Sequence, residues 1–262
     1  MNNNVISQVV ISTNQFLRYL GELAILFWQT IYWIFVPPFK VERFFEQAKR
    51  IGPESFLISS LVAFFVGMIL ALQMAYQMQK LSAEIYIANV VAVSLTRELA
   101  PVLTALIVAG RIGAGITAEI GSMKVTEQID ALRAFAADPV KYLVVPRFLA
   151  LVTMLPILTV FADLIGIFGG FIICVFKLSI GPSMYFTMVT QSLVAKDILT
   201  GLIKTVFFGM VIALVGCHQG LNTKGGAEGV GRATTISVVT SFILIIMTDC
   251  LFTAIFYFIF KT

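Results

Sequence analysis

The sequence is poor in charge. Only 12% of its 262 residues are Asp, Glu, Lys or Arg, whereas 59% are hydrophobic, and the mean hydropathy is +0.96. Soluble domains carry roughly 25% charged residues, so a chain of this length has too few charges to cover a soluble core. This shortage excludes an ordinary soluble protein and predicts an all-α integral membrane protein.

Cysteine and histidine are also scarce. Cys174, Cys217 and Cys250 lie far apart in apolar sequence, and the single histidine is His218. These spacings favour buried cysteine packing over a disulfide framework or a metal site. The N-terminal residues lack the basic segment and the cleavage site of a signal peptide. No basic run with interleaved aromatic residues suggests a nucleic-acid partner. We therefore attribute the net charge of +4 to basic loops that set the orientation in the membrane.

Nucleotide-binding and catalytic motifs are missing as well. Gly226 and Gly231 have the spacing of a phosphate-binding loop, but Arg232 and Ala233 stand where Lys and Ser or Thr are required. Neither Gly-x-Ser-x-Gly nor His-Glu-x-x-His occurs. We therefore expect no catalytic residue, metal or cofactor in this chain, and any ATP and Mg²⁺ would belong to a partner subunit.

Long apolar runs are what the sequence does contain. Five of them can cross a bilayer, and they cover residues 55–79, 87–118, 148–176, 198–217 and 233–260. Residues 40–54 and 119–147 are rich in Lys and Arg, which predicts cytoplasmic loops, a cytoplasmic N-terminus and a periplasmic C-terminus. The glycine-rich residues 218–232 predict another internal loop, and residues 177–197 predict an external loop with a short surface helix.

Residues 1–39 predict a helix that lies in the membrane interface. Apolar residues recur at helical spacing beside a polar stripe, Trp28, Tyr32 and Trp33 cluster near one end, and Pro37 ends the run. Aromatic residues next to a polar stripe are typical of interfacial helices. The alternative is a short additional span.

Residues 119–136 keep helical spacing but become polar, and Pro139 follows them. An apolar stripe with charged residues beside it predicts an amphipathic cytoplasmic helix that contacts another protein. The residues assigned to this contact are Val125, Glu127, Ile129, Leu132 and Arg133.

The later spans contain ionisable residues. An unpaired charge at the bilayer centre costs roughly 2.5–3.5 kcal/mol, so we expect Glu98 and Asp249 to pair with Arg97 or Lys204, and Asp163 lies inside the third span. Two interpretations stay open, because such pairs can tie helices together and can also line a substrate path.

Small residues and methionines suggest two further surfaces. Small side chains at four-residue spacing around Gly113 predict a helix-packing face. On the first span, Leu70, Met74 and Met78 share one helical face with Gln73 beside it, and Leu99 lies next to the charges of the second span. Flexible methionines can fit acyl chains. We interpret these five residues, from Leu70 to Leu99, as candidates for a lipid path; the alternative is packing against another helix or bulk lipid.

The stretch that resembles a known family covers residues 94–132 and reads SLTRELAPVLTALIVAGRIGAGITAEIGSMKVTEQIDAL. It is similar to the signature region of the MlaE/YrbE permeases, and GVGRATT at residues 229–235 is similar as well. The resemblance extends from about residue 20 to the end of the chain. Residues 68–80 diverge more from the family.

This resemblance implies a permease subunit of an ABC transporter that moves phospholipid or related lipids in the bacterial inner membrane. It implies a homodimer on two separate ATPase subunits, with residues 119–136 as the coupling helix. The loop at residues 77–86 and the segment 177–197 would face a periplasmic MCE-domain partner. Arg97, Glu98, Lys204 and Asp249 match the charged positions of the family.

Two other function classes remain as alternatives. An ion-coupled secondary transporter could use Glu98, Asp163 and Asp249 as proton or ion sites, but such carriers usually have broken helices and inverted repeats. An intramembrane enzyme is disfavoured by the missing motifs. A copurifying nucleotide-binding subunit would distinguish the permease from the carrier.

Overall fold

The computed structural model describes residues 2–38, 41–81 and 83–260, and every regular element in these ranges is helical. Five segments are long and apolar enough to cross a membrane. They are α2 (Val41–Gln79), a continuous segment Glu84–Val125, the segment Val140–Phe176, α9 (Ala195–Leu221) and α10 (Gly226–Phe260). The prediction of an all-α multi-pass membrane protein is confirmed.

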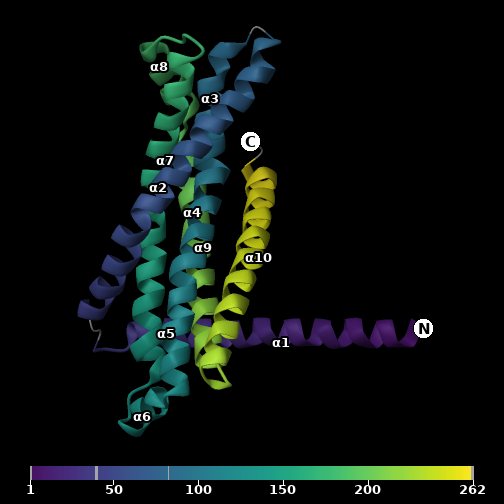
Figure 1. The fold of residues 1–262 in the computed structure, drawn as a ribbon, viewed down its shortest axis with the longest axis vertical. Coiled ribbons are helices and arrows are strands. Elements are labelled where there is room, and N and C mark those ends of the chain that lie inside the picture. The colour runs from purple at the N-terminus through teal and green to yellow at the C-terminus, as the bar shows by residue number, and fades with distance from the viewer. Residues whose placement is uncertain (1, 39–40, 82, 261–262) are drawn as a thin grey trace.

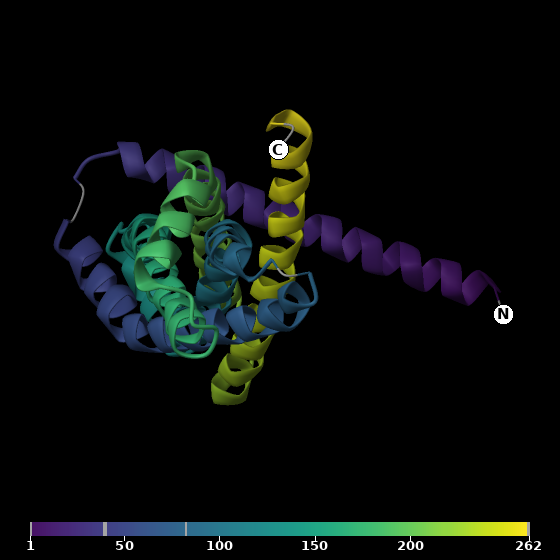
Figure 2. The same cartoon turned by 90° about the horizontal axis from the view of Figure 1, so that it is seen from above.

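Helix α1 (Asn2–Phe35) lies across the ends of the upright helices (Figure 1). Seen from above, its N-terminal half extends beyond the bundle (Figure 2). Its outer side exposes Trp28, Tyr32 and Phe35, whereas Leu26 is buried against the bundle. A helix that lies across the ends of the bundle and exposes one aromatic side has the form expected of an interfacial helix. Helix α1 is not among the five candidate spans.

The second span is one continuous helix with two π-helical turns. It runs through η1 (Glu84–Tyr86), α3 (Ile87–Ser94), η2 (Leu95–Leu99), α4 (Ala100–Val108), η3 (Ala109–Gly113) and α5 (Ala114–Val125). The π turns are η2 and η3, and a third, η4 (Val140–Val144), precedes α7 (Val145–Phe176). Such turns are rare and are found frequently at functional sites. Here η2 carries Arg97 and Glu98.

Glycines bring α2 and α7 into direct backbone contact. A Cβ atom added at Gly67 would overlap the carbonyl group of Gly166, and one added at Gly169 would overlap the carbonyl oxygen of Phe64. Lipid supplies little hydrophobic drive for helix association, so close backbone approach through small residues provides much of the packing energy. These two spans therefore form the tightly packed frame of the bundle.

A second small-residue face joins α5, α9 and α10. Thr117 Oγ1 lies 3.1 Å from the carbonyl oxygen of Gly216 and 2.8 Å from Ser237 Oγ. A Cβ atom at Gly113 would lie 3.2 Å from the side chain of Ile212. The predicted packing face around Gly113 is thus confirmed, with one hydroxyl group linking three helices.

A short helix, α8 (Pro182–Ser192), lies at the end of the bundle away from α6 (Gln128–Ala134), as expected for the segment 177–197 (Figure 1). Tyr185 anchors it, because this side chain is fully buried and its hydroxyl group donates a hydrogen bond to the carbonyl oxygen of Ile167, at 2.8 Å.

Two predicted loops are largely helical. The loop prediction for residues 40–54 is wrong because α2 begins at Val41: charged residues end the apolar run, but most of them are good helix formers. The loop prediction for residues 218–232 is also wrong beyond the short turn between Leu221 and Gly226. Gly220 supports close packing, since a Cβ there would lie 2.7 Å from Ile120 Cβ, whereas Gly225 and Gly226 have positive φ and form the turn.

The segment 119–136 is not the single helix that we predicted. Helix α5 ends at Val125 and α6 begins at Gln128, with Glu127 between them in the left-handed region at φ 59°. Helical spacing alone gives no sign of this break, because a non-glycine residue adopts positive φ only where tertiary packing compensates. Here the turn brings Ile129 into the core, where it is 1% exposed.

The contact between α2 and α7 yields a stability prediction. Gly67→Ala should destabilise the protein by about 1–3 kcal/mol, because the added methyl group forces the two backbones apart. The matched control is Gly231→Ala in α10, where no atom lies within 4 Å of the added Cβ and where alanine favours the helix. Thermal unfolding in detergent measures both variants. Equal melting temperatures would contradict the direct backbone contact.

Candidate functional site

Three charged residues from three spans meet at Lys204. This lysine on α9 has only 2% of its side chain exposed, and its Nζ lies 2.5 Å from Glu98 Oε2 and forms an ion pair with Asp249 Oδ1 at 2.9 Å. Glu98 belongs to the π turn η2 and Asp249 to α10. The prediction that both carboxylates pair with Arg97 or Lys204 is confirmed, and Lys204 is the partner of both.

Polar neighbours complete the coordination of Lys204. Its ammonium group donates hydrogen bonds to Thr253 Oγ1 at 2.7 Å and to the carbonyl oxygen of Arg97 at 3.3 Å. The Thr253 hydroxyl group in turn donates to the Glu98 carboxylate at 3.2 Å. A buried ammonium group is tolerated when carboxylates and further hydrogen bonds surround it. We call Glu98, Lys204, Asp249 and Thr253 the Lys204 cluster.

The Lys204 cluster reaches the surface of the chain. The side chain of Glu98 is 37% exposed and that of Asp249 is 21% exposed, whereas Lys204 is enclosed. The carboxylates therefore lie between the buried ammonium group and the outside of the bundle. This arrangement satisfies both interpretations of the intramembrane charges, since the cluster ties three spans together and also presents polar atoms at their surface.

Arg97 lies beside the cluster without joining it through its guanidinium group. Its Nη1 forms an ion pair with Asp197 near the start of α9, at 3.6 Å. Successive residues on a helix point about 100° apart, so the adjacent Arg97 and Glu98 reach different partners. Arg97 therefore ties η2 to α9 at a second point.

Asp163 is not part of the Lys204 cluster. It is buried on α7, and its Oδ1 has no hydrogen-bond partner among the described residues. No ion pair of the described part of the chain includes this carboxyl group. The structure thus assigns Asp163 no role in holding the spans together.

The candidate lipid-path residues lie at the opposite end of α2 from its charged residues. Leu70, Met74 and Met78 are half-buried and pack with Leu99 against an apolar core formed by α2, α3, α7 and α8. Gln73 is exposed beside them. Within one chain this stripe packs against neighbouring helices. This packing is the alternative that the sequence left open. Only part of the surface of the stripe is available to a ligand.

The predicted coupling residues divide into two groups. Ile129 is buried in the main core and Leu132 packs against that core, so these side chains do not form an apolar surface for a partner. Val125 is 37% exposed, and Glu127 and Arg133 are exposed. The expected apolar docking stripe is therefore wrong in its inner half, because the break at Glu127 turns those residues inward.

Sequence reasoning missed a charge cluster at the start of this segment. Glu119 accepts hydrogen bonds from Arg147 Nη2 at 2.6 Å and from Arg50 Nη1 at 2.7 Å. Arg147 is buried and also donates to the carbonyl oxygen of Leu143 at 2.7 Å. In the sequence both arginines indicate only membrane topology, although each stands near the start of a long helix. Glu119 thus links α5 to α2 and α7.

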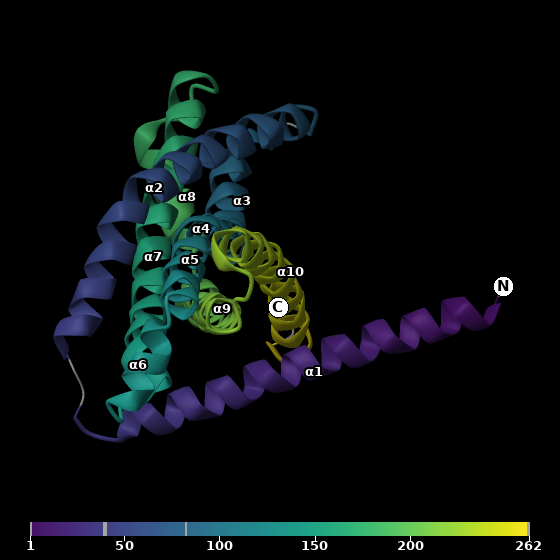
Figure 3. The ribbon, with the colours of Figure 1, turned by 60° about the horizontal axis from the view of Figure 1, so that its bottom comes forward.

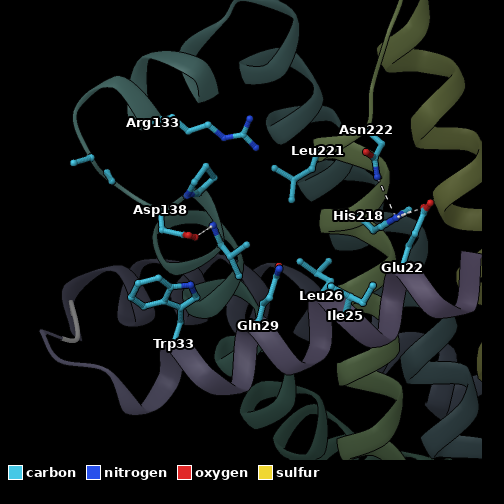
Figure 4. A pocket seen from close by; sticks show the side chains of 14 residues that line it. Glu22, Ile25, Leu26, Gln29, Trp33, Arg133, Asp138, His218, Leu221 and Asn222 are labelled. Carbon is cyan, nitrogen blue, oxygen red and sulfur yellow. Dashed lines mark hydrogen bonds and ion pairs between the residues drawn. The ribbon is translucent and has the colours of Figure 1, made fainter.

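A cavity of about 780 Å³ lies next to this segment, between α1, the turn after α6 and the end of α9 (Figure 4). On one side of it Glu22 Oε2 lies 3.1 Å from His218 Nε2, which attaches α1 to α9. The Arg18 guanidinium beside Glu22 lowers the pKa of this carboxyl group, and His218 contributes in the same direction. Figure 3 shows α1 running below α9 and past α10.

Comparison with known proteins gives consistent results. A family model described as Permease MlaE matches residues 44–255. A protein of Rickettsia typhi, named a probable ABC transporter permease protein, is 42% identical over 250 residues, which are 95% of this chain and 96% of the relative. A protein of Synechocystis with the same type of name is 45% identical over 204 residues, which are 78% of each chain.

A plant relative is also similar. The chloroplastic protein TRIGALACTOSYLDIACYLGLYCEROL 1 of Arabidopsis thaliana is 35% identical over 212 residues, which are 81% of this chain and 61% of the relative.

The Lys204 cluster yields a prediction about charge balance. Lys204→Met should destabilise the protein by about 3–5 kcal/mol, because Glu98 and Asp249 lose their shared cation. Adding Glu98→Gln and Asp249→Asn to Lys204→Met should recover much of this loss, since no uncompensated charge remains. The control, Lys49→Met, removes an exposed lysine of α2 and should have little effect. Thermal unfolding in detergent measures all of these variants. Simple additivity of the changes would contradict the cluster.

Proposed function

The chain belongs to the MlaE permease family, and on this premise we propose that it moves phospholipid between the bacterial inner membrane and a periplasmic MCE-domain protein. Its relatives carry the name of ABC transporter permeases, which are transport subunits that work with ATPase subunits. In this proposal ATP and Mg²⁺ are bound by the ATPase, and this chain carries out no chemical step.

The Lys204 cluster is the observation that supports an amphiphilic cargo. Its partly exposed carboxylates stand at the surface of otherwise apolar spans, and Leu99 directly follows Glu98 in the chain. A lipid needs both kinds of surface, one polar for the headgroup and one apolar for the acyl chains. The plant relative is named after a galactolipid, which favours a lipid over a water-soluble cargo.

Two copies of the chain complete the pathway in this proposal. Helix α10 exposes a long apolar side that includes Ile243, Ile246 and Leu251, and only 11% of its most apolar part is buried within one chain. Cyclic symmetry is the usual arrangement for identical subunits. Pairing along α10 would place two Lys204 clusters near each other, because Asp249 belongs to the same helix.

The cytoplasmic end supplies the contact with the ATPase. Val125, Glu127 and Arg133 are among its exposed residues. Glu119 lies in α5 as well and binds the arginines of α2 and α7, so a displacement of α5 and α6 would reach both helices of the tightly packed frame. We infer that this ionic link transmits the movement of the ATPase to α2 and α7. In this proposal the N-terminus lies in the cytoplasm and the C-terminus in the periplasm.

Asp163 is the one observation that favours the alternative of an ion-coupled carrier, since a buried carboxyl group without a partner is typical of proton relays. Reconstitution separates the two functions. The purified chain, with its ATPase, should move labelled phospholipid from vesicles to an added MCE-domain protein only when ATP is present. An ATPase unable to hydrolyse ATP is the control. Movement driven by a proton or sodium gradient without ATP would overturn the permease proposal.

The exposed surface of α5 and α6 yields a prediction about coupling. Glu127→Lys combined with Arg133→Glu should abolish copurification of the ATPase while the spans stay folded, because both side chains face outward. Glu228→Lys, on an exposed residue at the start of α10, is the matched control and should leave copurification intact. Ile129→Asp should instead unfold the protein, since it buries an unpaired carboxylate. Normal copurification of the double variant would exclude this contact surface.

A further inference from the structure

A second cavity, of about 320 Å³, adjoins the one in Figure 4, and the two share Trp33, Ala136, Ala137 and Asp138. It lies where the end of α1, the start of α2, the π turn η4 and the start of α7 come together. Its remaining lining residues are Pro38, Arg43, Lys141, Tyr142, Val145 and Pro146. Neither the Lys204 cluster nor the exposed coupling residues contribute to it.

Two cations line this cavity without a carboxylate partner. The Cζ atom of Arg43 lies 3.3 Å from the ring centroid of Tyr142. Lys141 Nζ lies 5.0 Å from the ring centroid of Trp33 and 3.2 Å from the carbonyl oxygen of Pro37. Every ion pair within the described ranges joins other residues. Aromatic rings, the Tyr142 hydroxyl group and a carbonyl group orient both side chains, and none of these groups carries a negative charge.

Among the described residues of the lining, Asp138 is the single acid, and its carboxylate already accepts hydrogen bonds from the backbone. Its Oδ1 accepts hydrogen bonds from the backbone N–H groups of Val140, at 2.8 Å, and Lys141, at 3.3 Å. This caps the beginning of η4, where unpaired N–H groups need an acceptor. With two cations and one acid, the described residues of the lining have a formal charge of +1, so an anion is the ligand that they favour.

The cavity lies at the depth of lipid headgroups. Trp28, Tyr32 and Phe35 expose one aromatic side of α1, as expected for a helix in the membrane interface. Trp33, between them in sequence, faces the cavity instead. Val145 and Pro146 add apolar wall at the start of a span. The cavity thus combines cations, an indole ring and apolar surface at the membrane boundary.

We propose that this cavity binds the phosphate-bearing headgroup of an anionic phospholipid in the leaflet where α1 lies. Arg43 supplies a planar group for two phosphate oxygens, and Lys141 supplies a point charge. Basic pockets between helices on the cytoplasmic side bind anionic headgroups in this manner. The proposal goes beyond the proposed function, because this lipid is a bound ligand rather than the cargo and the site exists whichever lipid is transported.

The consequence is a link between membrane composition and the coupling segment. The bound headgroup would contact Trp33 of α1 and Lys141 of η4, and Ala136 to Asp138, directly after α6, form the same wall. Occupancy would therefore hold the interfacial helix against the segment that follows the ATPase contact surface.

The tryptophan content of the chain allows a direct test. The sequence contains two tryptophans, Trp28 and Trp33, so Trp28→Phe leaves Trp33, in the cavity lining, as the single residue excited at the red edge of the tryptophan absorption band. The full-length Trp28→Phe chain in a neutral detergent is titrated with short-chain phosphatidylglycerol, phosphatidylcholine or inorganic phosphate. We expect a saturable change in Trp33 emission with phosphatidylglycerol and little change with the other two ligands.

Charge variants then assign the response to the cavity. Lys141→Gln should weaken phosphatidylglycerol binding about fivefold, and Arg43→Gln with Lys141→Gln about thirtyfold, because each basic residue contributes roughly a factor of five near an anionic headgroup. Lys49→Gln with Lys224→Gln removes the same charge from exposed positions outside the cavity and should leave the affinity unchanged. The Lys141→Gln variant keeps the stacking of Arg43 on Tyr142, and its thermal unfolding in detergent checks that the fold is retained.

Three results would overturn the proposal. Equal responses to phosphatidylglycerol and phosphatidylcholine would show that headgroup charge is not recognised. An equal response to inorganic phosphate would assign the site to soluble phosphate compounds. Equal weakening of phosphatidylglycerol binding in the Lys49 and Lys224 control would show that general surface charge, and not the cavity, causes the effect.

Discussion

The structure depends on one electrostatic constraint: an ammonium group within apolar spans has to stay next to carboxylates. Lys204 meets this constraint with Glu98 and Asp249, so α9, η2 and α10 have one shared point that cannot separate without exposing a charge to lipid. The π turn at Leu95–Leu99 belongs to this arrangement, because it carries Glu98 toward α9 while Arg97 binds Asp197. The polar atoms that secure the bundle are the same atoms that a headgroup would meet at its surface.

Close helix packing complements this charged point. Backbone contacts at Gly67 and Gly166 hold α2 against α7, and the Thr117 hydroxyl group holds α5 against α9 and α10. The bundle thus consists of a closely packed pair of helices and a second group that is centred on the charges. Glu119 joins the two parts at the end of the bundle near α6 through Arg50 and Arg147. A transporter driven from the cytoplasm needs such a connection, because force applied to α5 and α6 has to change the position of the other spans.

The end of the bundle near α6 also brings together elements that lie far apart in the chain. Helix α1 is attached to α9 through Glu22 and His218, and it borders both cavities next to the turn after α6. Helix α1 and the segment around α6 therefore meet in one small region. If α1 lies in the membrane interface and this segment contacts the ATPase, as we propose, the state of the membrane surface can influence that contact.

The sequence by itself determined the membrane class, the five spans and the small-residue face around Gly113, since hydropathy and spacing are local properties. It also indicated that Glu98 and Asp249 need a cation, because burial of charge has the same cost in any fold. Only the tertiary structure decided that Lys204 rather than Arg97 is that cation, that Glu119 binds two arginines, and that Ile129 faces the core beyond a left-handed Glu127. These outcomes depend on the direction of side chains from different helices and on strain that packing compensates, and no local pattern encodes either of them.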